Sequence, residues 1–294
     1  MTLLLDTPPG ENGLIVQRCD LWNYNAIGVV SGDEACVVDP GITPQEIAAL
    51  RSAVEAGGRR ITHVVLTHSH HDHIRGWAAF GDATVVAPRI VADKEGGPRA
   101  RILAGKTKVD ERMGIADADF QYPDVDVTYE TRHTLRIGDL ELRLEFLPGH
   151  SNCTSIVHVP ALRALLTADY LVSPGLPYCR WEPAAFESAN RRLRGMIEDE
   201  EIGLVVPAHN DLILDQHAAL AAVDEELSYF RDLRADVRAR RAAGIPKERL
   251  LRETATRMRE RRNADIGARA RQDADNARRM LAEETALSPG PGSR

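Results

Sequence analysis

Apolar residues fall into short runs separated by turn residues in the first part of the chain. Between residues 13 and 39 the runs GLIVQRC and NAIGVVSGDEACVVDPG enclose the turn SGDE, a pattern that predicts antiparallel strands. Residues 43–57 show helical periodicity, with Thr43 as the N-cap and a proline at the first helical position. The next run, ITHVVLTH, has the length of a buried strand and carries His68 to its carboxyl end. We therefore expect a β-meander followed by an αβ unit.

The pattern beyond His68 predicts a short helix over 74–81, a strand over 83–88 and a long irregular segment over 95–124. A second β-rich region follows, with Gly138 and Asp139 as its hairpin turn. Its strands are expected at residues 125–130, 134–149, 154–160 and 164–169.

The remaining pattern completes a second, similar half. Residues 182–199 form an amphipathic helical pattern, and residues 202–210 form a buried strand that again ends on a histidine. Helix formers dominate from about residue 215. Two halves of this kind predict an α/β fold, an αββα sandwich in which two packed mixed β-sheets are flanked by helices. We expect one domain over 1–215 and a C-terminal helical extension over 216–294 with a disordered end.

Composition limits the class of protein further. The N-terminus lacks a basic region and a long apolar run, and no uncharged stretch of about 18 apolar residues occurs, so we expect a cytoplasmic protein with no membrane partner. Four cysteines are scattered without a CxxC pair. They suit reduced thiols better than a disulfide scaffold, and any metal must then be held mainly by histidine and carboxylate.

The net charge of −7 is unevenly distributed. Residues 228–262 hold twelve Lys/Arg against five Asp/Glu. We interpret this basic stretch as a solvated helix face with ion pairs such as Glu248 with Arg252 and Glu253 with Arg257. A nucleic acid or an acidic partner is the alternative, although the overall acidity makes nucleic acid the weaker hypothesis. The five basic residues of the segment 95–124 are interpreted in the same two ways, as solvated charges or as a site for an acidic substrate.

The motif HSHHDH places His68, His70, Asp72 and His73 in the loop after a buried strand. Alternate residues of an extended segment face the same way, so the first pair can serve one ion and the second pair another. Imidazole and carboxylate are ligands that zinc accepts at neutral pH. Two ions about 3.5–4 Å apart form the binuclear arrangement used in metal-assisted hydrolysis.

Other strand ends offer the ligands that a single loop lacks. His150 stands in LPGHSNCTS, Asp169 ends ALLTAD, and His209 ends LVVPAH. With these residues the sequence resembles the metallo-β-lactamase-fold hydrolase superfamily, in its glyoxalase II and lactonase-like branch, over roughly residues 13–214. The final motif, PAHN, departs from the glycine that many relatives carry before this histidine.

The resemblance implies a ligand set. His68, His70 and His150 would hold one ion, Asp72, His73 and His209 the second, and Asp169 would bridge the two. Asp39 in CVVDPG would brace the loop without binding metal. His71 is interpreted as a structural neighbour with its ring turned away, and the remaining histidines as structural: His63, His133, His158 and His217.

The resemblance also implies chemistry. Two divalent ions, most simply zinc with manganese or iron as alternatives, would supply a metal-bound hydroxide, and Asp72 and Asp169 would orient it or carry a proton. Tyr170 and Tyr178 follow the bridging aspartate and would donate to an oxyanion as a tyrosine does in some lactonases, or else pack as ordinary aromatic residues.

The expected function is hydrolysis of an acyl bond in a small molecule, a thioester, lactone or related ester. Histidine at position 70 disfavours the diiron flavoprotein branch, and the forty residues between Asp169 and His209 are too few for an inserted nuclease domain. A phosphodiesterase or nuclease of the same fold is the alternative, with β-lactam hydrolysis and a non-catalytic metal-stabilised binding protein behind it. The sequence leaves open whether the protein forms a homodimer.

Overall fold

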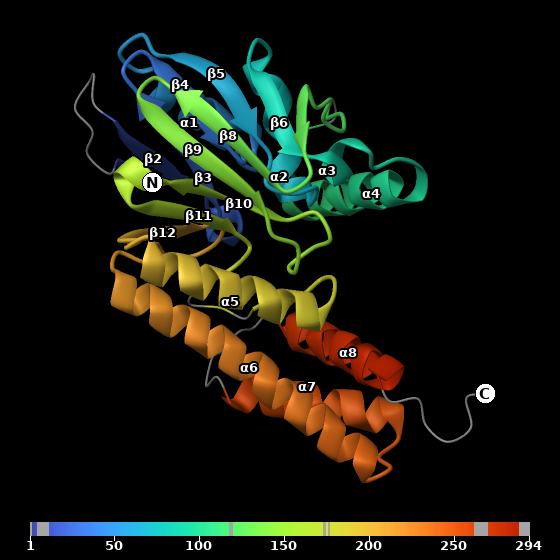
Figure 1. The fold of residues 1–294 in the computed structure, drawn as a ribbon. Coiled ribbons are helices and arrows are strands. Elements are labelled where there is room, and N and C mark those ends of the chain that lie inside the picture. Colours follow the sequence, from blue (N-terminus) through green and yellow to red (C-terminus); the bar gives the residue numbers. More distant parts are fainter. Residues whose placement is uncertain are drawn as a thin grey trace. The chain divides into compact units, whose positions relative to one another are not determined.

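The computed structural model describes residues 2–4, 12–117, 120–172, 175, 177–261 and 270–287. The chain folds into two compact units that interleave along the sequence (Figure 1). Unit 1 comprises Met1–Leu147, Cys153–Ala168 and Leu204–Leu212, and unit 2 comprises Pro148–Asn152, Asp169–Gly203 and Ile213–Arg294. The predicted division after residue 215 stays a prediction, and the predicted disordered end beyond residue 287 lies outside the described residues.

Unit 1 contains a seven-stranded mixed sheet in the order β1-β2-β3-β4-β5-β6-β7. Neighbours from β1 to β4 are antiparallel, and those from β4 to β7 are parallel. Its strands are β1 (Thr2–Leu4), β2 (Gly13–Arg18), β3 (Asn25–Ser31), β4 (Glu34–Val38), β5 (Arg60–Val65), β6 (Thr84–Pro88) and β7 (Val127–Tyr129).

The second sheet of unit 1 has five strands in the order β12-β11-β10-β9-β8. Only the pair β11 and β12 is parallel among its described neighbours. Its strands are β8 (Arg132–Ile137), β9 (Leu140–Phe146), β10 (Ser155–Val159), β11 (Ala164–Ala168) and β12 (Leu204–Pro207). The predicted turn between β8 and β9 is confirmed, with Gly138 at φ +51°, a left-handed conformation that glycine adopts at no steric cost.

A hydrophobic core joins the two sheets face to face. Buried residues from the first sheet, among them Val29 and Val65, pack in one cluster with residues from the second, among them Leu142 and Val157. The alternation along each strand explains this arrangement, because every second side chain faces the partner sheet. The prediction of two packed mixed sheets is confirmed.

The other face of the seven-stranded sheet is covered by helix α1 (Pro44–Glu55), whose Ile47, Leu50 and Val54 enter a second core cluster. The predicted N-cap is confirmed, because the Thr43 hydroxyl accepts a hydrogen bond from the amide of Glu46 in a full capping box. Short helices follow β5, β6 and β10: α2 (His71–Ile74), η2 (Trp77–Phe80), α3 (Arg89–Ala92) and η3 (Pro160–Leu162), with η1 (Leu21–Asn23) before β3.

The prediction of an irregular segment over 95–124 is wrong, because residues Gly96–Met113 form the helix α4. The residues that suggested a loop lie at its ends: two glycines and a proline occupy the first turn, and Gly114 ends the helix in a left-handed conformation. A proline in the first turn and a glycine just past the end are ordinary helix boundaries. Few apolar positions on this helix are buried, so the periodicity that marks a helix is weak here.

Helix α4 is fastened to α2 by a buried ion cluster. The guanidinium of Arg75, fully buried, pairs with the carboxylate of Asp110 and lies 3.6 Å from that of Asp117. Lys106 joins both carboxylates at 2.8 Å and 3.0 Å. Arg99 lies over the ring of Tyr122, 4.7 Å from its centroid. Two of the five basic residues of α4, Lys106 and Arg99, therefore have partners within the protein.

Unit 2 consists largely of four helices among its described residues: α5 (Pro183–Asp199), α6 (Gln216–Ala242), α7 (Lys247–Arg261) and α8 (Ala270–Leu287). Aromatic side chains form part of its interior, with the rings of Phe186 and Phe230 centred 4.8 Å apart. No helix in the described part of the chain combines the length and the apolar character needed to cross a bilayer.

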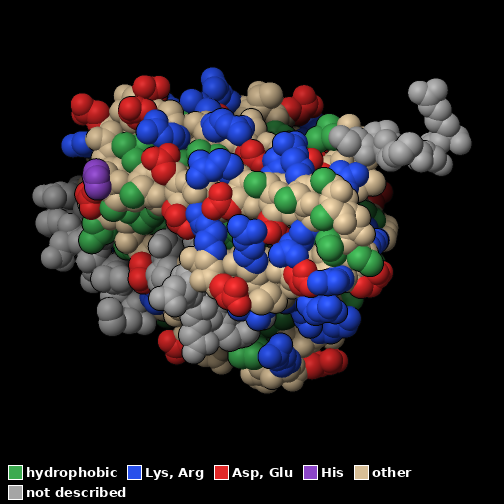
Figure 2. All heavy atoms as spheres, turned by 90° about the horizontal axis from the view of Figure 1, so that it is seen from below, with side chains coloured by type: hydrophobic (Ala, Val, Ile, Leu, Met, Phe, Trp, Pro, Cys, Tyr) green, Lys and Arg blue, Asp and Glu red, His purple; other side chains and the backbone are tan. Residues whose placement is uncertain are grey.

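The basic stretch 228–262 lies mainly on α6 and α7, and its charges are largely paired with carboxylates. Arg234 contacts Glu187, Glu283 and Glu284, and Arg240 contacts Asp236 and Glu253. The predicted partner of Glu253 is corrected: Arg249 and Arg240 bind it, while Arg257 binds Asp236. Figure 2 shows a face on which Lys and Arg side chains lie among Asp and Glu side chains. The helix surface is a network of ion pairs, which favours the solvated-face interpretation.

Replacement of Asp110 by alanine should destabilise the protein by about 3 kcal/mol, because it leaves the buried Arg75 without its main counter-ion. Urea unfolding followed by circular dichroism measures the change. Glu130→Ala is the matched control, since its partner Arg89 is exposed and the pair should contribute less than about 0.5 kcal/mol. Equal effects of the two substitutions would contradict the assignment.

Candidate metal centre

The loop after β5 brings four polar side chains to the carboxyl end of the parallel part of the sheet. The strand proper ends at Val65, and an extended segment carries His68 and His70 before α2 begins at His71. His68 and His73 are fully buried. Ligand sites in open α/β sheets lie at this edge, because successive parallel strands end there.

Asp72, His73 and His209 form one group within unit 1, each offering a ligand atom within 4.8 Å of the others. One oxygen of Asp72 lies 3.4 Å from Nε2 of His209 and 3.9 Å from Nε2 of His73. His209 follows β12 and pairs with Tyr24 through an isolated β-bridge, which ties the end of the second sheet to the first. These three predicted ligands are brought together, as the HxHxDH motif and the strand-end histidine predicted.

Asp39 supports this group through hydrogen bonds. Its carboxylate accepts the amide of Thr67 at 2.8 Å, the Thr67 hydroxyl at 2.6 Å and Nδ1 of His73 at 2.8 Å. The residue is buried and has φ +48°, a left-handed conformation that aspartate tolerates better than most residues. The predicted bracing role of Asp39 is confirmed by these contacts.

His68 and His70 form the second donor pair of unit 1. Nε2 of His68 lies 2.8 Å from Nδ1 of His70, and Nδ1 of His68 lies 3.1 Å from the Thr67 hydroxyl. Because that hydroxyl donates to Asp39, it accepts a hydrogen bond from His68 Nδ1, which leaves the lone pair of Nε2 facing His70. The rings of His68 and His73 are centred 3.9 Å apart, so the two donor sets of this unit adjoin.

Unit 2 carries the remaining two predicted ligands as a pair. Nε2 of His150 lies 3.0 Å from a carboxylate oxygen of Asp169. Nδ1 of His150 donates to the carbonyl oxygen of Tyr178 at 2.6 Å, and the His150 amide donates to the Tyr170 hydroxyl at 3.0 Å. A side chain at Gly149 would clash with that hydroxyl at 2.7 Å, which explains why glycine precedes the histidine.

The two tyrosines serve the loop of His150 in this structure. Tyr170 is fully buried beside Phe186, and burial raises the pKa of its hydroxyl well above the usual value. The Tyr178 hydroxyl donates to Asp275 of α8 at 2.9 Å. These contacts give both residues a structural role, and their role as oxyanion donors stays a prediction.

The donor atoms fit divalent metal ions such as zinc. His73, His209 and His150 each use Nδ1 in a hydrogen bond to a carboxylate or a backbone carbonyl, and each places Nε2 near an aspartate oxygen. This is the pattern of metal-ligating histidines, in which the outer hydrogen bond fixes the tautomer and leaves the other nitrogen for the ion.

The electrostatics favour an ionised Asp72. Burial opposes its ionisation, but the neighbouring His73, His209 and His71 outweigh it and lower the pKa of this carboxyl. His71 lies outside the group formed by Asp72, His73 and His209, and its ring faces Trp22 with centroids 5.8 Å apart. His133 stacks on Tyr129, and His63 lies 2.9 Å from the Thr62 hydroxyl, as expected of structural histidines.

Sequence reasoning missed two features of the site. Lys94 donates to the Ser69 hydroxyl at 2.7 Å and lies 3.7 Å from the Cys153 thiol, which also accepts the Ser69 amide. Trp22, at φ +60°, presents its carbonyl oxygen 3.2 Å from Nδ1 of His209. Neither residue lies in a motif, and the signal for Ser69 was its place between the candidate ligands His68 and His70.

With this geometry in view, comparisons with known proteins define the class. The family model of the metallo-beta-lactamase superfamily matches residues 20–248, so the chain belongs to this superfamily. Curated relatives include a hydroxyacylglutathione hydrolase of Anaeromyxobacter dehalogenans, 29% identical over 225 residues, which are 76% of this chain and 74% of the relative. Another, from Jannaschia sp., is 28% identical over 57% of this chain. The chain spans only 52% of that relative's length and about half of several others.

Solved structures show the same fold. A metallo-beta-lactamase family protein from Thermus thermophilus aligns with a TM-score of 0.64 at 18% identity, covering 93% of this chain and 94% of its own. The sec-alkylsulfatase Pisa1 from Pseudomonas sp. aligns with a TM-score of 0.65 at 14% identity, covering 95% of this chain and 50% of its own. The family match places the chain in the metallo-beta-lactamase superfamily, and these structures share its fold.

Replacement of Asp39 by asparagine should lower zinc affinity at the group of Asp72, His73 and His209 by about 10- to 100-fold, because an amide does not hold His73 in the required tautomer as a carboxylate does. Isothermal titration of metal-stripped protein with zinc measures it. Asp33→Asn, in an exposed turn, is the control. Unchanged zinc affinity in the Asp39 variant would show that the hydrogen bond from His73 to this carboxylate is not needed for metal binding.

Replacement of Lys94 by methionine should weaken binding of one ion by about 3- to 10-fold, because Ser69 loses the contact that fixes the segment between His68 and His70. The same titration measures the zinc affinity of each site, and the site weakened by the substitution should show the loss. Lys108→Met, on the exposed face of α4, should leave both affinities as they are. A similar loss in both variants would point to a general charge effect.

Proposed function

We propose that this protein is a binuclear metal-dependent hydrolase that cleaves an acyl bond in a small molecule, with thioesters as its first substrate class and lactones second. The observation that carries the proposal is the group of Asp72, His73 and His209, in which both histidines are oriented through Nδ1 and a buried carboxylate faces their Nε2 atoms. Support for the thioester comes from the relatives named hydroxyacylglutathione hydrolase, since an S-acylglutathione is a thioester.

The ligand assignment follows the family motif. His68, His70 and His150 would hold one ion, Asp72, His73 and His209 would hold the other, and Asp169 would contribute to both. Support within unit 1 is the adjoining position of the rings of His68 and His73, and support within unit 2 is the contact of His150 with Asp169. Zinc is the expected metal because the donors are imidazole and carboxylate.

Bound ions of this kind act as Lewis acids and bring the pKa of water to about 7. Residues of the chain itself would orient the reacting groups and transfer protons. The neighbouring histidines lower the pKa of the Asp72 carboxyl, so this carboxylate would be available to bind metal and to orient the attacking water. The carboxylate of Asp169 is the second proton-handling group, and the hydrogen bond from His150 to the Tyr178 carbonyl keeps the imidazole directed at it.

The phosphodiesterase alternative loses its main support. Several arginines of the basic stretch that would serve phosphates are instead paired with Glu187, Glu253, Glu284 and Asp236. A cytoplasmic location and a homodimer stay predictions from the sequence.

The proposal is tested on one preparation. Elemental analysis should give about two zinc or manganese ions per chain, and chelation should abolish thioester hydrolysis that zinc then restores. Asp72→Asn should reduce kcat by at least about 100-fold with a smaller change in KM, because the amide lacks the charge that binds metal and takes up a proton.

Exposed Asp82 supplies the control, since Asp82→Asn makes the same change away from the ligands. Thioesters, lactones, a β-lactam and bis(p-nitrophenyl) phosphate are assayed side by side. Faster turnover of the phosphodiester than of every acyl substrate would refute the assignment, and so would a protein that takes up no metal.

A further inference from the structure

Residues 177–181 form a loop that contacts the candidate ligand His150 within unit 2. The carbonyl oxygen of Tyr178 accepts Nδ1 of His150 at 2.6 Å, and the amide of Arg180 donates to the carbonyl oxygen of His150 at 2.8 Å. The ring and the backbone of the candidate ligand are therefore both bonded to this loop. The orientation of His150 depends on what holds the 177–181 loop in turn.

Asn276 of α8 binds the backbone of this loop on both sides of Tyr178. Its Nδ2 donates to the carbonyl oxygen of Pro177 at 2.7 Å, and its Oδ1 accepts the amide of Cys179 at 3.1 Å. That amide belongs to the same peptide unit as the Tyr178 carbonyl that accepts His150. A trans peptide unit is planar and its N–H and C=O point in opposite directions, so a bond that fixes the one also aims the other. Asn276 and His150 are thus bonded to the two ends of one peptide group.

This chain of hydrogen bonds affects bond strength as well as geometry. Acceptance of the Cys179 amide by Asn276 polarises the peptide group, which makes its carbonyl oxygen a stronger acceptor for the Nδ1 proton of His150. A stronger hydrogen bond at Nδ1 makes Nε2 a better electron-pair donor to a metal ion. Nε2 is the atom of His150 that lies 3.0 Å from Asp169.

The side-chain amide of Asn276 is itself held in one orientation. Asn276 is fully buried, and its Nδ2 lies 3.2 Å from the hydroxyl oxygen of Tyr229 on α6. The Tyr229 hydroxyl donates to Asp273 at 2.9 Å, so its oxygen is left to accept from Asn276. Nδ2 therefore faces two acceptors and Oδ1 faces an amide donor, which is the arrangement that a primary amide requires.

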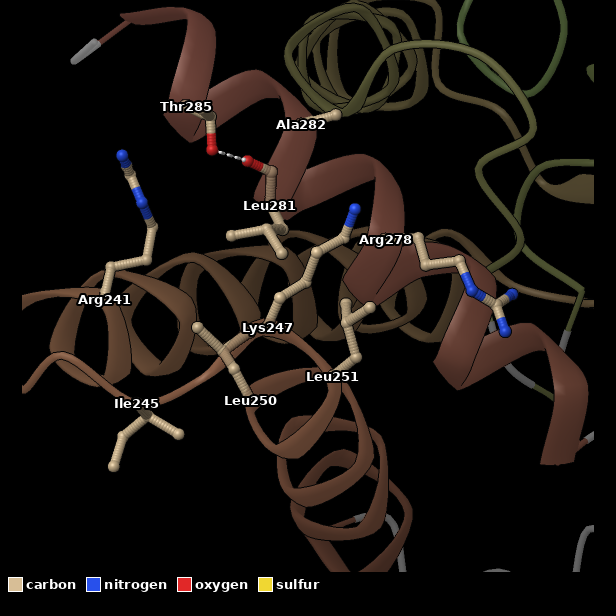
Figure 3. Close-up of a pocket in the computed structure, with 9 residues that line it drawn as sticks. All are labelled: Arg241, Ile245, Lys247, Leu250, Leu251, Arg278, Leu281, Ala282 and Thr285. Carbon is tan, nitrogen blue, oxygen red and sulfur yellow. Dashed lines mark hydrogen bonds between the residues drawn. The ribbon is translucent and has the colours of Figure 1, made fainter. Parts of the chain in front are cut away.

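Other residues of α8 bind the rest of the 177–181 loop. Asp275 accepts the Tyr178 hydroxyl at 2.9 Å, and Arg279, one turn further along the helix, donates to the carbonyl oxygen of Trp181 at 2.9 Å. A different set of α8 residues lines the groove that this helix forms with α6 and α7 (Figure 3): Arg278, Leu281, Ala282 and Thr285. The residues that hold the loop are therefore separate from those that line the groove.

We propose that Asn276 is a positioning residue of the metal centre, which orients His150 through the peptide group between Tyr178 and Cys179 without contacting the ion. The inference rests on the proposed function in one respect, that His150 binds metal. It adds a helix from the end of the described chain to the parts of unit 2 that the centre needs. The opposing view, that Asn276 only contributes to packing, predicts a different outcome in each experiment below.

Asn276→Ala should lower the zinc affinity of one ion by about 3- to 10-fold in calorimetric titration of metal-stripped protein, because His150 loses the hydrogen-bond chain that orients it. Asn190→Ala is the matched control. Asn190 is equally buried in α5 of the same unit, and its amide donates to the carbonyl oxygen of Phe186 at 3.2 Å, within its own helix. Its replacement should change zinc affinity by less than about twofold.

Cobalt(II) in place of zinc supplies a spectroscopic test, since its visible absorption depends on coordination geometry. The spectrum should change in Asn276→Ala and should match that of the wild type in Asn190→Ala. Zinc affinities and a cobalt spectrum like those of the wild type in Asn276→Ala would overturn the proposal. Equal effects of the two substitutions would also overturn it, because the loss would then come from general loosening of unit 2.

Hydrogen exchange on the wild-type protein gives a test that does not require Asn276→Ala to fold. Coupling between two sites is reciprocal, so if the Asn276 contact favours the ion, the ion must favour the contact. Zinc should therefore slow amide exchange in residues 177–181 and in α8 by a similar factor, about 3- to 10-fold, with little change in α7. No slowing in α8, or equal slowing in α7, would refute the inference. A wild-type protein that takes up no zinc would refute the proposed function itself, so the two failures are distinguishable.

Discussion

The hydrogen bonds to the Asp39 carboxylate are the interaction on which the rest of the candidate centre depends. One buried group, at the end of β4, receives the amide and hydroxyl of Thr67 and the imidazole of His73. It thereby fixes the path of the chain after β5 and the tautomer of the candidate ligand His73 at the same time. Through the Thr67 hydroxyl it also orients His68. A carboxyl group this far from solvent is tolerable because three donors meet it.

Much of the fold could be predicted from the sequence, because strands and capped helices leave local signals. The alternation in 134–149 marked the β8–β9 hairpin, and Thr43 with Pro44 marked the start of α1. Candidate ligands could be identified for a different reason. Metal chemistry restricts side-chain types, so HSHHDH and the histidines at strand ends stand out even before their neighbours in space are known.

What could not be predicted depends on contacts between residues distant in the sequence. Helix α4 leaves little periodic signal because ion pairs of its Asp110 with Arg75 and of its Lys106 with Asp117, rather than a buried apolar stripe, hold it in place. The Lys94 contact with Ser69 crosses 25 positions and follows no motif. The same reasoning applies to Tyr178, whose hydroxyl is bound by a residue nearly a hundred positions later. Burial and partner choice are properties of the folded chain, and no local pattern encodes them.

The position of β12 has a consequence for biosynthesis. This strand is the last of the second sheet in sequence and lies beside β11, and His209 follows it directly. A ribosome therefore exposes the histidine-rich loop of residues 68–73 long before it delivers the residue that completes that group. The group of Asp72, His73 and His209 can therefore be completed only after β12 has been synthesised, so its assembly depends on contacts that are distant in the sequence and form late.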